Sequence, residues 1–101
     1  MAVDKDLWLV VNESEILDKM SKSIEEDPSR IITEREDLEY LLNSIHRDVL
    51  ILELRYQRGS IGAETMAQVN VEAIISAMKS KIADLKMRCN IVAIDKSPAG
   101  K

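Results

Sequence analysis

Apolar residues recur at helical spacing along most of the chain, and two segments keep this pattern over many turns. Each has apolar residues at seven-residue steps, namely Leu38, Ile45 and Leu52 in the first segment and Val71, Met78 and Leu85 in the second. Such a repeat, with more apolar residues three or four positions away, places one continuous stripe along a helix. The pattern therefore predicts two long helices that pack along each other.

The first long helix has both a start signal and a stop signal. Thr33 and Glu36 match the Thr-x-x-Glu pattern of a capping box, in which each side chain binds the backbone N–H of the other residue. Gly59 follows the last residue of the stripe, where a glycine can adopt the left-handed conformation that ends a helix. Because only a short connection follows Gly59, we expect the two long helices to form an antiparallel helical hairpin.

In the N-terminal third of the chain, the pattern predicts a short helix. The segment before this helix is either a strand or an extended arm. Leu7–Val11 is an uninterrupted apolar run, typical of a strand or of an extended arm that packs on the helices. Asn12 and Glu15 resemble a capping box, which places the start of the first helix at Asn12. In this helix Glu13 belongs to the polar face. Pro28 ends the helix, because proline has no N–H to continue it.

The C-terminal residues divide into a segment with two possible structures and a tail. Residues 90–95 either continue the second long helix or form a short strand that pairs with residues 7–11. Residues 96–101 contain a proline, a glycine and two lysines, and we expect a disordered tail. The sequence thus predicts an all-α chain with a single helical domain at residues 1–95, in which short terminal strands stay open as an alternative.

Composition supports a helical core and narrows the class of protein. Hydrophobic residues make up 46% of the 101 residues and aromatic residues only 3%, so the core must be mainly aliphatic. Cys89 is the one cysteine, which leaves no intrachain disulfide and favours a reducing environment. The sequence shows neither a signal peptide nor an apolar run long enough to span a membrane, so we expect a cytoplasmic protein without a membrane partner.

Charge is divided unevenly along the chain. Residues 1–54 contain 6 Lys and Arg against 14 Asp and Glu, whereas residues 55–101 contain 8 against 4. In a hairpin, the acidic start of the first long helix would lie beside the basic end of the second. The acidic residues in question are Glu34, Glu36, Asp37 and Glu39, and the basic residues are Lys79, Lys81, Lys86 and Arg88. We expect these charges to pair within the fold; a basic surface for nucleic acid is the alternative.

An apolar belt on the first long helix exceeds what one partner helix can cover. Consecutive residues are about 100° apart on a helix, so Val49, Leu50, Ile51 and Leu54 point around its whole circumference. Each would forgo roughly 1.5 to 3 kcal/mol of burial if it stayed in water. We therefore expect the belt to form a protein interface in a homodimer or higher oligomer. Trp8 is expected to anchor the N-terminal segment, either in the chain's own core or in a partner.

Few residues of the sequence match the pattern of a catalytic, ligand-binding or metal-binding site. The candidate anion-binding site at the hairpin tip consists of Arg55, Tyr56, Arg58 and Ser60, where two guanidinium groups lie near a helix start. His46 is the sole histidine and lacks further ligands at metal-binding spacing, so neither a metal site nor a cofactor is predicted. Asp48 lies on the apolar stripe, where we expect it to pair with Arg47, with Arg55 or with a basic residue across an interface.

Together these features favour a non-enzymatic helical module for protein–protein interaction, such as an adaptor, an assembly factor or a small regulator. It would bind a second copy of itself and, we expect, another protein. One alternative is a regulator that binds nucleic acid or a nucleotide through the basic hairpin tip and the basic face of the second long helix. A third is an enzyme whose site lies at a subunit interface and accepts an acidic small molecule. No catalytic residues are predicted.

Overall fold

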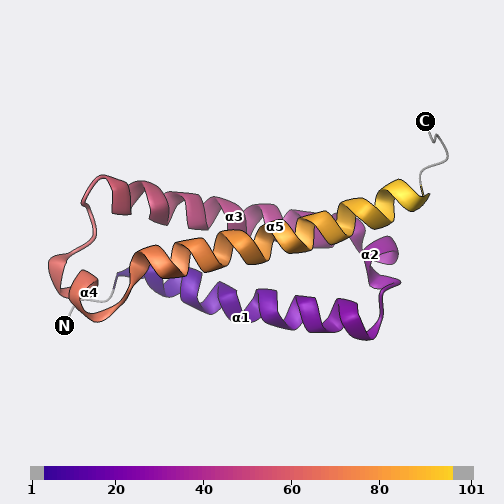
Figure 1. Ribbon diagram of the computed structural model, residues 1–101, viewed down its shortest axis with the longest axis horizontal. Helices are drawn as coiled ribbons and strands as arrows, with labels where there is room; N and C mark the ends of the chain where they lie inside the picture. The colour runs from indigo at the N-terminus through magenta and orange to yellow at the C-terminus, as the bar shows by residue number, and fades with distance from the viewer. Residues whose placement is uncertain (1–3, 97–101) are drawn as a thin grey trace.

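The computed structural model describes residues 4–96, with side chains for residues 4–89. It contains five helices: α1 (Lys5–Glu26), α2 (Arg30–Thr33), α3 (Arg35–Gln57), α4 (Ala63–Gln68) and α5 (Val71–Lys96). The three long helices lie side by side, and each runs opposite to the long helix before it in the chain (Figure 1). The short helices α2 and α4 lie at opposite ends of this bundle (Figure 1). The prediction of an all-helical fold is confirmed for the described residues.

The N-terminal helix is much longer than predicted, and the strand interpretation of residues 7–11 is wrong. Helix α1 has 22 residues and begins at Lys5, where the Asp4 side chain accepts a hydrogen bond from the Leu7 N–H at 3.2 Å. Asn12, the predicted start, lies inside this helix. The run looked like a strand because apolar residues on both the inner and the outer face of the helix interrupt the helical period.

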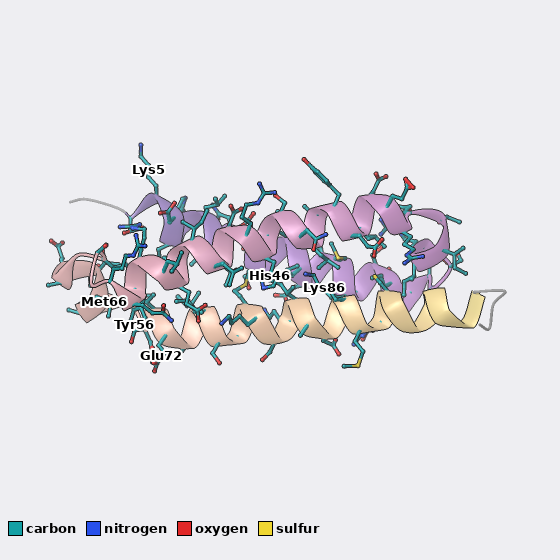
Figure 2. All side chains as sticks on the ribbon, turned by 90° about the horizontal axis from the view of Figure 1, so that it is seen from above. Lys5, His46, Tyr56, Met66, Glu72 and Lys86 are labelled. Atoms are coloured by element: carbon teal, nitrogen blue, oxygen red, sulfur yellow. The ribbon has the colours of Figure 1, made fainter. Side chains whose placement is uncertain are left out.

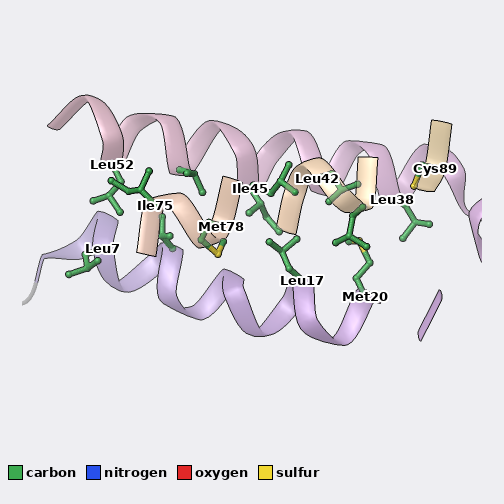
Figure 3. Close-up of a cluster of buried hydrophobic side chains, with 14 of the residues drawn as sticks. Leu7, Leu17, Met20, Leu38, Leu42, Ile45, Leu52, Ile75, Met78 and Cys89 are labelled. Atoms are coloured by element: carbon green, nitrogen blue, oxygen red, sulfur yellow. The ribbon is translucent and has the colours of Figure 1, made fainter. Parts of the chain in front are cut away.

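The core is one aliphatic cluster to which all three long helices contribute (Figure 3). Among the residues buried most completely are Val10 and Leu17 of α1, Leu42, Ile45, Val49 and Leu52 of α3, and Val71, Met78, Ile82, Leu85 and Cys89 of α5. The predicted stripes of α3 and α5 therefore face inward. Helix α1 adds a third stripe, so the fold is a bundle of three long helices and not a hairpin with a short extra helix.

Helix boundaries differ from the predictions at two places. Thr33 ends α2 and its hydroxyl donates to the Ser29 carbonyl at 3.3 Å, while α3 begins at Arg35 after a break at Glu34. The predicted capping box is thus not formed, because Thr33 is itself helical. The second long segment is also interrupted, between α4 and α5, where the Asn70 side chain accepts a hydrogen bond from the Ala73 N–H at 3.0 Å.

The C-terminal segment is helical as far as it is described. Residues 90–96 belong to α5, so the strand alternative for residues 90–95 is wrong. Lys96, the first residue of the predicted disordered tail, ends α5. The rest of that tail lies outside the described residues.

Three basic residues of α5 are paired with acidic residues within the fold, but with partners other than those predicted. Lys79 binds Glu53 of α3 at 2.7 Å and Lys81 binds Asp18 of α1 at 2.9 Å. Arg88 binds Asp84 one turn earlier on its own helix at 3.1 Å. Helix α1 lies along α5. Its acidic and hydroxyl side chains therefore lie beside basic residues of α5, in the place where the acidic residues at the start of α3 were expected. The basic residues also divide between two sides of α5 and do not form one stripe.

Gly59 provides a test of the turn after α3. Its φ is 71°, the left-handed region predicted for a residue that ends a helix, and an added Cβ would meet nothing within 4 Å. We expect Gly59→Ala to lower the free energy of unfolding by about 1 kcal/mol, from backbone strain alone. The matched control is Gly62→Ala, because Gly62 has φ −58° and equally open surroundings.

Thermal unfolding followed by circular dichroism measures the difference between these variants. A cost of about 1 kcal/mol corresponds to about 4 to 8 °C in Tm for a domain of this size. We expect Gly62→Ala to stay close to the wild type. Equal Tm values for the two variants would contradict the strained turn.

Candidate functional site

The exposed part of the predicted belt is a patch on the outer side of α3. Leu50, Ile51 and Leu54 are 41%, 42% and 50% exposed, and we call these three residues the α3 patch. Val49 is fully buried in the core, so its assignment to the interface is wrong. The physical reason is that Val49 continues the inward row of Ile45 and Leu52, whereas the other three point away from that row.

Trp8 is exposed and does not anchor α1 in the core. It is the largest apolar side chain on the surface of α1, with 59% of its area in solvent. Its neighbours in sequence, Leu7 and Val10, take the core positions instead. The expectation that Trp8 packs within its own chain is therefore wrong, while its role in binding a partner remains a prediction.

A shallow hollow lies between α1 and α5. Its volume is about 360 Å³, and its lining residues are Val11, Ser14, Glu15, Ile74, Ala77 and Met78. The lining is mostly apolar, with Glu15 as its one charged residue. Met78, one of its lining residues, also belongs to the core.

At the predicted anion-binding tip, Arg55 is already occupied by the chain itself. Its guanidinium group binds Asp4 at 2.7 Å and Asp6 at 2.9 Å, which joins the end of α3 to the start of α1. The hydrogen bond from Arg55 lowers the pKa of Asp4 below its usual value. Tyr56 packs against the core, and the Ser60 carbonyl accepts a hydrogen bond from Arg55 at 3.2 Å. The four predicted residues thus do not converge on an open anion site.

Arg58 has a different environment from Arg55. It is the C-cap residue of α3, is exposed, and makes no salt bridge with any described residue. Of the two predicted anion-binding arginines, only Arg58 is available to a group outside the chain.

Two carboxyl groups interact between α1 and α3 in the middle of the bundle. Glu13 is only 8% exposed and lies in the inward stripe of α1, between Val10 and Leu17. Its side chain interacts with that of Asp48 on α3. The prediction that Glu13 lies on the polar face is wrong, and Asp48 faces this carboxyl group instead of the predicted Arg47 or Arg55.

The carboxyl pair is poorly satisfied by its own chain. The Oε1 atom of Glu13 is buried and has no hydrogen-bond partner among the described residues. Burial, followed by the neighbouring Asp48 carboxyl group, raises the pKa of Glu13 to about 8. Glu13 therefore keeps a proton at neutral pH in the isolated chain. Ionisation of Glu13 in this buried position beside Asp48 is therefore unfavourable for the stability of the chain alone.

His46 contacts a lysine across two helices, and Cys89 is buried in the core. His46 Nδ1 lies 3.1 Å from Lys86 Nζ between α3 and α5 (Figure 2). Desolvation, and then the charge of Lys86, lower the pKa of His46. Burial raises the pKa of the Cys89 thiol, which keeps it protonated and unreactive. In residues 4–89, no group of three or more His, Cys, Asp or Glu side chains is placed to hold a metal ion.

Comparison with protein-family models, with curated proteins and with solved structures found no match for the chain. None of the helices in the described part of the chain combines the length and apolar character needed to cross a membrane. The α3 patch and the carboxyl pair are thus the two features from which a function can be inferred.

The raised pKa of Glu13 predicts a specific pH dependence of stability. The folded chain holds a proton on Glu13 up to about pH 8, whereas the unfolded chain releases it near the ordinary value of 4.5. This group therefore stabilises the fold fully below pH 4.5, and its contribution is lost as the pH rises through 8. The neighbouring titratable group that faces it from α3 is Asp48.

We expect Glu13→Gln to remove this dependence, because glutamine does not ionise. Urea unfolding followed by circular dichroism at pH 5 and pH 9 should show the wild type losing at least about 1.4 kcal/mol more than the variant. The matched control is Glu15→Gln, which changes an exposed residue on the same helix. If all three proteins follow parallel pH profiles, Glu13 does not hold its proton in the folded chain.

Arg55 and Arg58 should differ in their effect on stability. Arg55→Ala leaves the buried Asp4 carboxylate without its partner, and we expect a loss of about 1 to 3 kcal/mol. Arg58→Ala removes no described contact, and we expect a change within about 0.5 kcal/mol. Thermal unfolding of both variants checks this expectation, and equal losses would contradict it.

Proposed function

We propose that the protein is a non-enzymatic helical module for protein–protein interaction that associates with a second copy of itself through the α3 patch. In this proposal α3 and α5 act as an antiparallel hairpin, and α1 completes the bundle. A reducing, cytoplasmic setting belongs to the same proposal, because the single cysteine is buried and free.

The observation that carries the proposal is the exposure of three large aliphatic side chains within about one turn of α3. Leu50, Ile51 and Leu54 each leave 41% to 50% of their area in water although three helices are available to cover them. Burying the remainder would stabilise a complex by roughly 1 kcal/mol for each residue. Apolar side chains that gather at one place on a small protein are typical of the centre of an interface.

The surroundings of the patch favour contact on one side more than on the other. Towards α5, Glu53 of α3 already binds Lys79 at 2.7 Å, so a charged pair borders the patch there. Helix α1 carries three exposed aliphatic residues, of which Val11 lines the hollow towards α5 while Leu9 and Ile16 do not. The apolar surface therefore extends from α3 towards α1.

The oligomeric state of suitable variants tests the proposal. Leu50→Glu combined with Ile51→Lys places two charges in the patch, and we expect the mass measured by light scattering to fall to that of a monomer. The matched control is Ile32→Lys combined with Met87→Glu, which introduces the same charges at exposed apolar residues of α2 and α5. We expect the control to keep the mass of the wild type.

Two results would overturn the proposal: a wild type that is monomeric at all accessible concentrations, or a patch variant that keeps the oligomer mass.

The salt dependence of the binding affinity distinguishes self-association from nucleic-acid binding. Affinity for a nucleic acid held by about six or more phosphate contacts falls about 10³-fold or more between roughly 50 and 200 mM salt. An interface centred on aliphatic residues should respond far less.

A further inference from the structure

Helices α1 and α3 share an outward-facing aliphatic surface. The two helices run antiparallel (Figure 1), and Arg55 of α3 binds Asp6 near the start of α1 at 2.9 Å, which fixes their register. Leu9 of α1 therefore lies near the level of the α3 patch, and Ile16 lies about two turns further along α1. Both side chains are exposed, as are those of the patch. We call Leu9, Ile16 and the α3 patch together the α1–α3 surface.

Two unpaired basic side chains border this surface at the end where α1 begins. Lys5 lies one turn before Leu9 on α1, and Arg58 lies one turn after Leu54 on α3. Both are exposed, and neither makes a salt bridge with a described residue. Figure 2 shows Lys5 pointing out from the bundle.

Two more unpaired basic side chains border the other end of the surface. Lys19 follows Ile16 by three residues on α1, and Arg47 precedes Ile51 by four residues on α3, so each lies one turn from an exposed aliphatic residue. Both are exposed and make no salt bridge within residues 4–89. We call these four residues, Lys5, Lys19, Arg47 and Arg58, the basic border.

Most acidic residues of the same stretch, residues 4–19 of the chain together with residues 47–58, do not reach this surface as free charges. Those with basic partners are Asp4 and Asp6 with Arg55, Asp18 with Lys81, and Glu53 with Lys79. Glu15 lines the hollow towards α5, Glu13 is buried, and Asp48 is half-buried. The free charge around the surface is therefore mainly positive, although the whole chain has a net charge of −4.

We propose that the α1–α3 surface binds an acidic amphipathic helix of another protein, which packs aliphatic residues on the surface and places carboxylates against the basic border. This inference shares the α3 patch with the proposed self-association and names a second partner for it. Lys5 and Lys19 are 14 residues apart on α1, or about 21 Å, which is the length of about four helical turns.

A second copy fits the charge of this surface less well than an acidic helix does. An antiparallel pair centred between Ile51 and Leu54 brings Arg47 of one copy to the level of Arg58 of the other, because each arginine lies four residues from the central pair. A second copy thus gains from the aliphatic residues alone, whereas an acidic helix gains from the aliphatic residues and the basic border. Opposite charges at the margin of an interface speed association and select one class of partner.

An acidic helix also fits this surface better than an anionic lipid membrane does. The net negative charge of the chain opposes its approach to such a membrane. The exposed aliphatic residues lie along two neighbouring helices, which is the arrangement on which a further amphipathic helix packs.

A designed peptide tests the proposal. The probe is a fluorescently labelled peptide of about 21 residues, with leucine at the first and fourth positions of each heptad and glutamate or alanine at the others. Fluorescence anisotropy measures its affinity for the full chain. We expect the acidic peptide to bind at least about tenfold more tightly than a control peptide in which lysine replaces each glutamate. A second control peptide, with glutamine in place of each leucine, should also bind at least about tenfold more weakly.

Variants of the protein locate the contact. We expect Arg47→Glu and Arg58→Glu each to weaken binding of the acidic peptide by at least about fivefold. Arg35→Glu is the matched control, because it reverses an exposed arginine of α3 outside the surface and should leave the affinity unchanged. Leu9→Gln should weaken binding as well, whereas Ile32→Gln, at an exposed position of α2, should not. Circular dichroism of each variant verifies that it is folded.

The outcomes distinguish this inference from the proposed function. Specific binding of the acidic peptide to a wild type that is monomeric supports this inference and overturns self-association alone. A wild-type dimer that does not bind the acidic peptide overturns this inference and leaves self-association intact.

Three further results would overturn the inference. They are equal affinity for the acidic and the basic peptide, unchanged affinity in both arginine variants, and binding to vesicles of equal parts phosphatidylserine and phosphatidylcholine without binding to the acidic peptide.

Discussion

The fold depends on α1 packing along α3 and α5 at the same time. Two amphipathic helices alone form a thin layer with little interior, and here a third aliphatic stripe closes the core. Charged contacts set the position of α1 on both sides, through Arg55 on α3 and Lys81 on α5. The Lys81 pair is exposed and contributes little free energy, so it fixes the register more than it stabilises. Arg55 also satisfies the buried Asp4 carboxylate and therefore contributes to stability as well.

Within residues 4–89, Glu13 is a charged-type residue that this packing buries. A carboxyl group occupies a place in the α1 stripe that a leucine would fill at lower cost, and another carboxyl group faces it. Placing two like groups together in a buried position weakens the isolated chain.

Much of the fold could be predicted from the sequence, because helical periodicity records which residues face a core. The stripes of α3 and α5, the left-handed Gly59 and the exposure of Leu50, Ile51 and Leu54 all follow from residue spacing. Residues 7–11 could not be assigned, because their inner and outer faces are equally apolar. The carboxyl pair was missed because Glu13 resembles any surface glutamate until the partner helix is placed. One signal was present: Glu13 lies three residues after Val10 and four before Leu17, at the spacing of the stripe itself.

The position of Trp8 has a practical consequence for anyone who works with this chain. The sequence has no phenylalanine and one tryptophan, and that single indole ring lies on the outer surface of α1, largely in water. Its fluorescence thus reports on the solvent around the first turns of α1 and responds little to the packing of the core. The same ring is a built-in probe for any molecule that binds to that flank of the bundle.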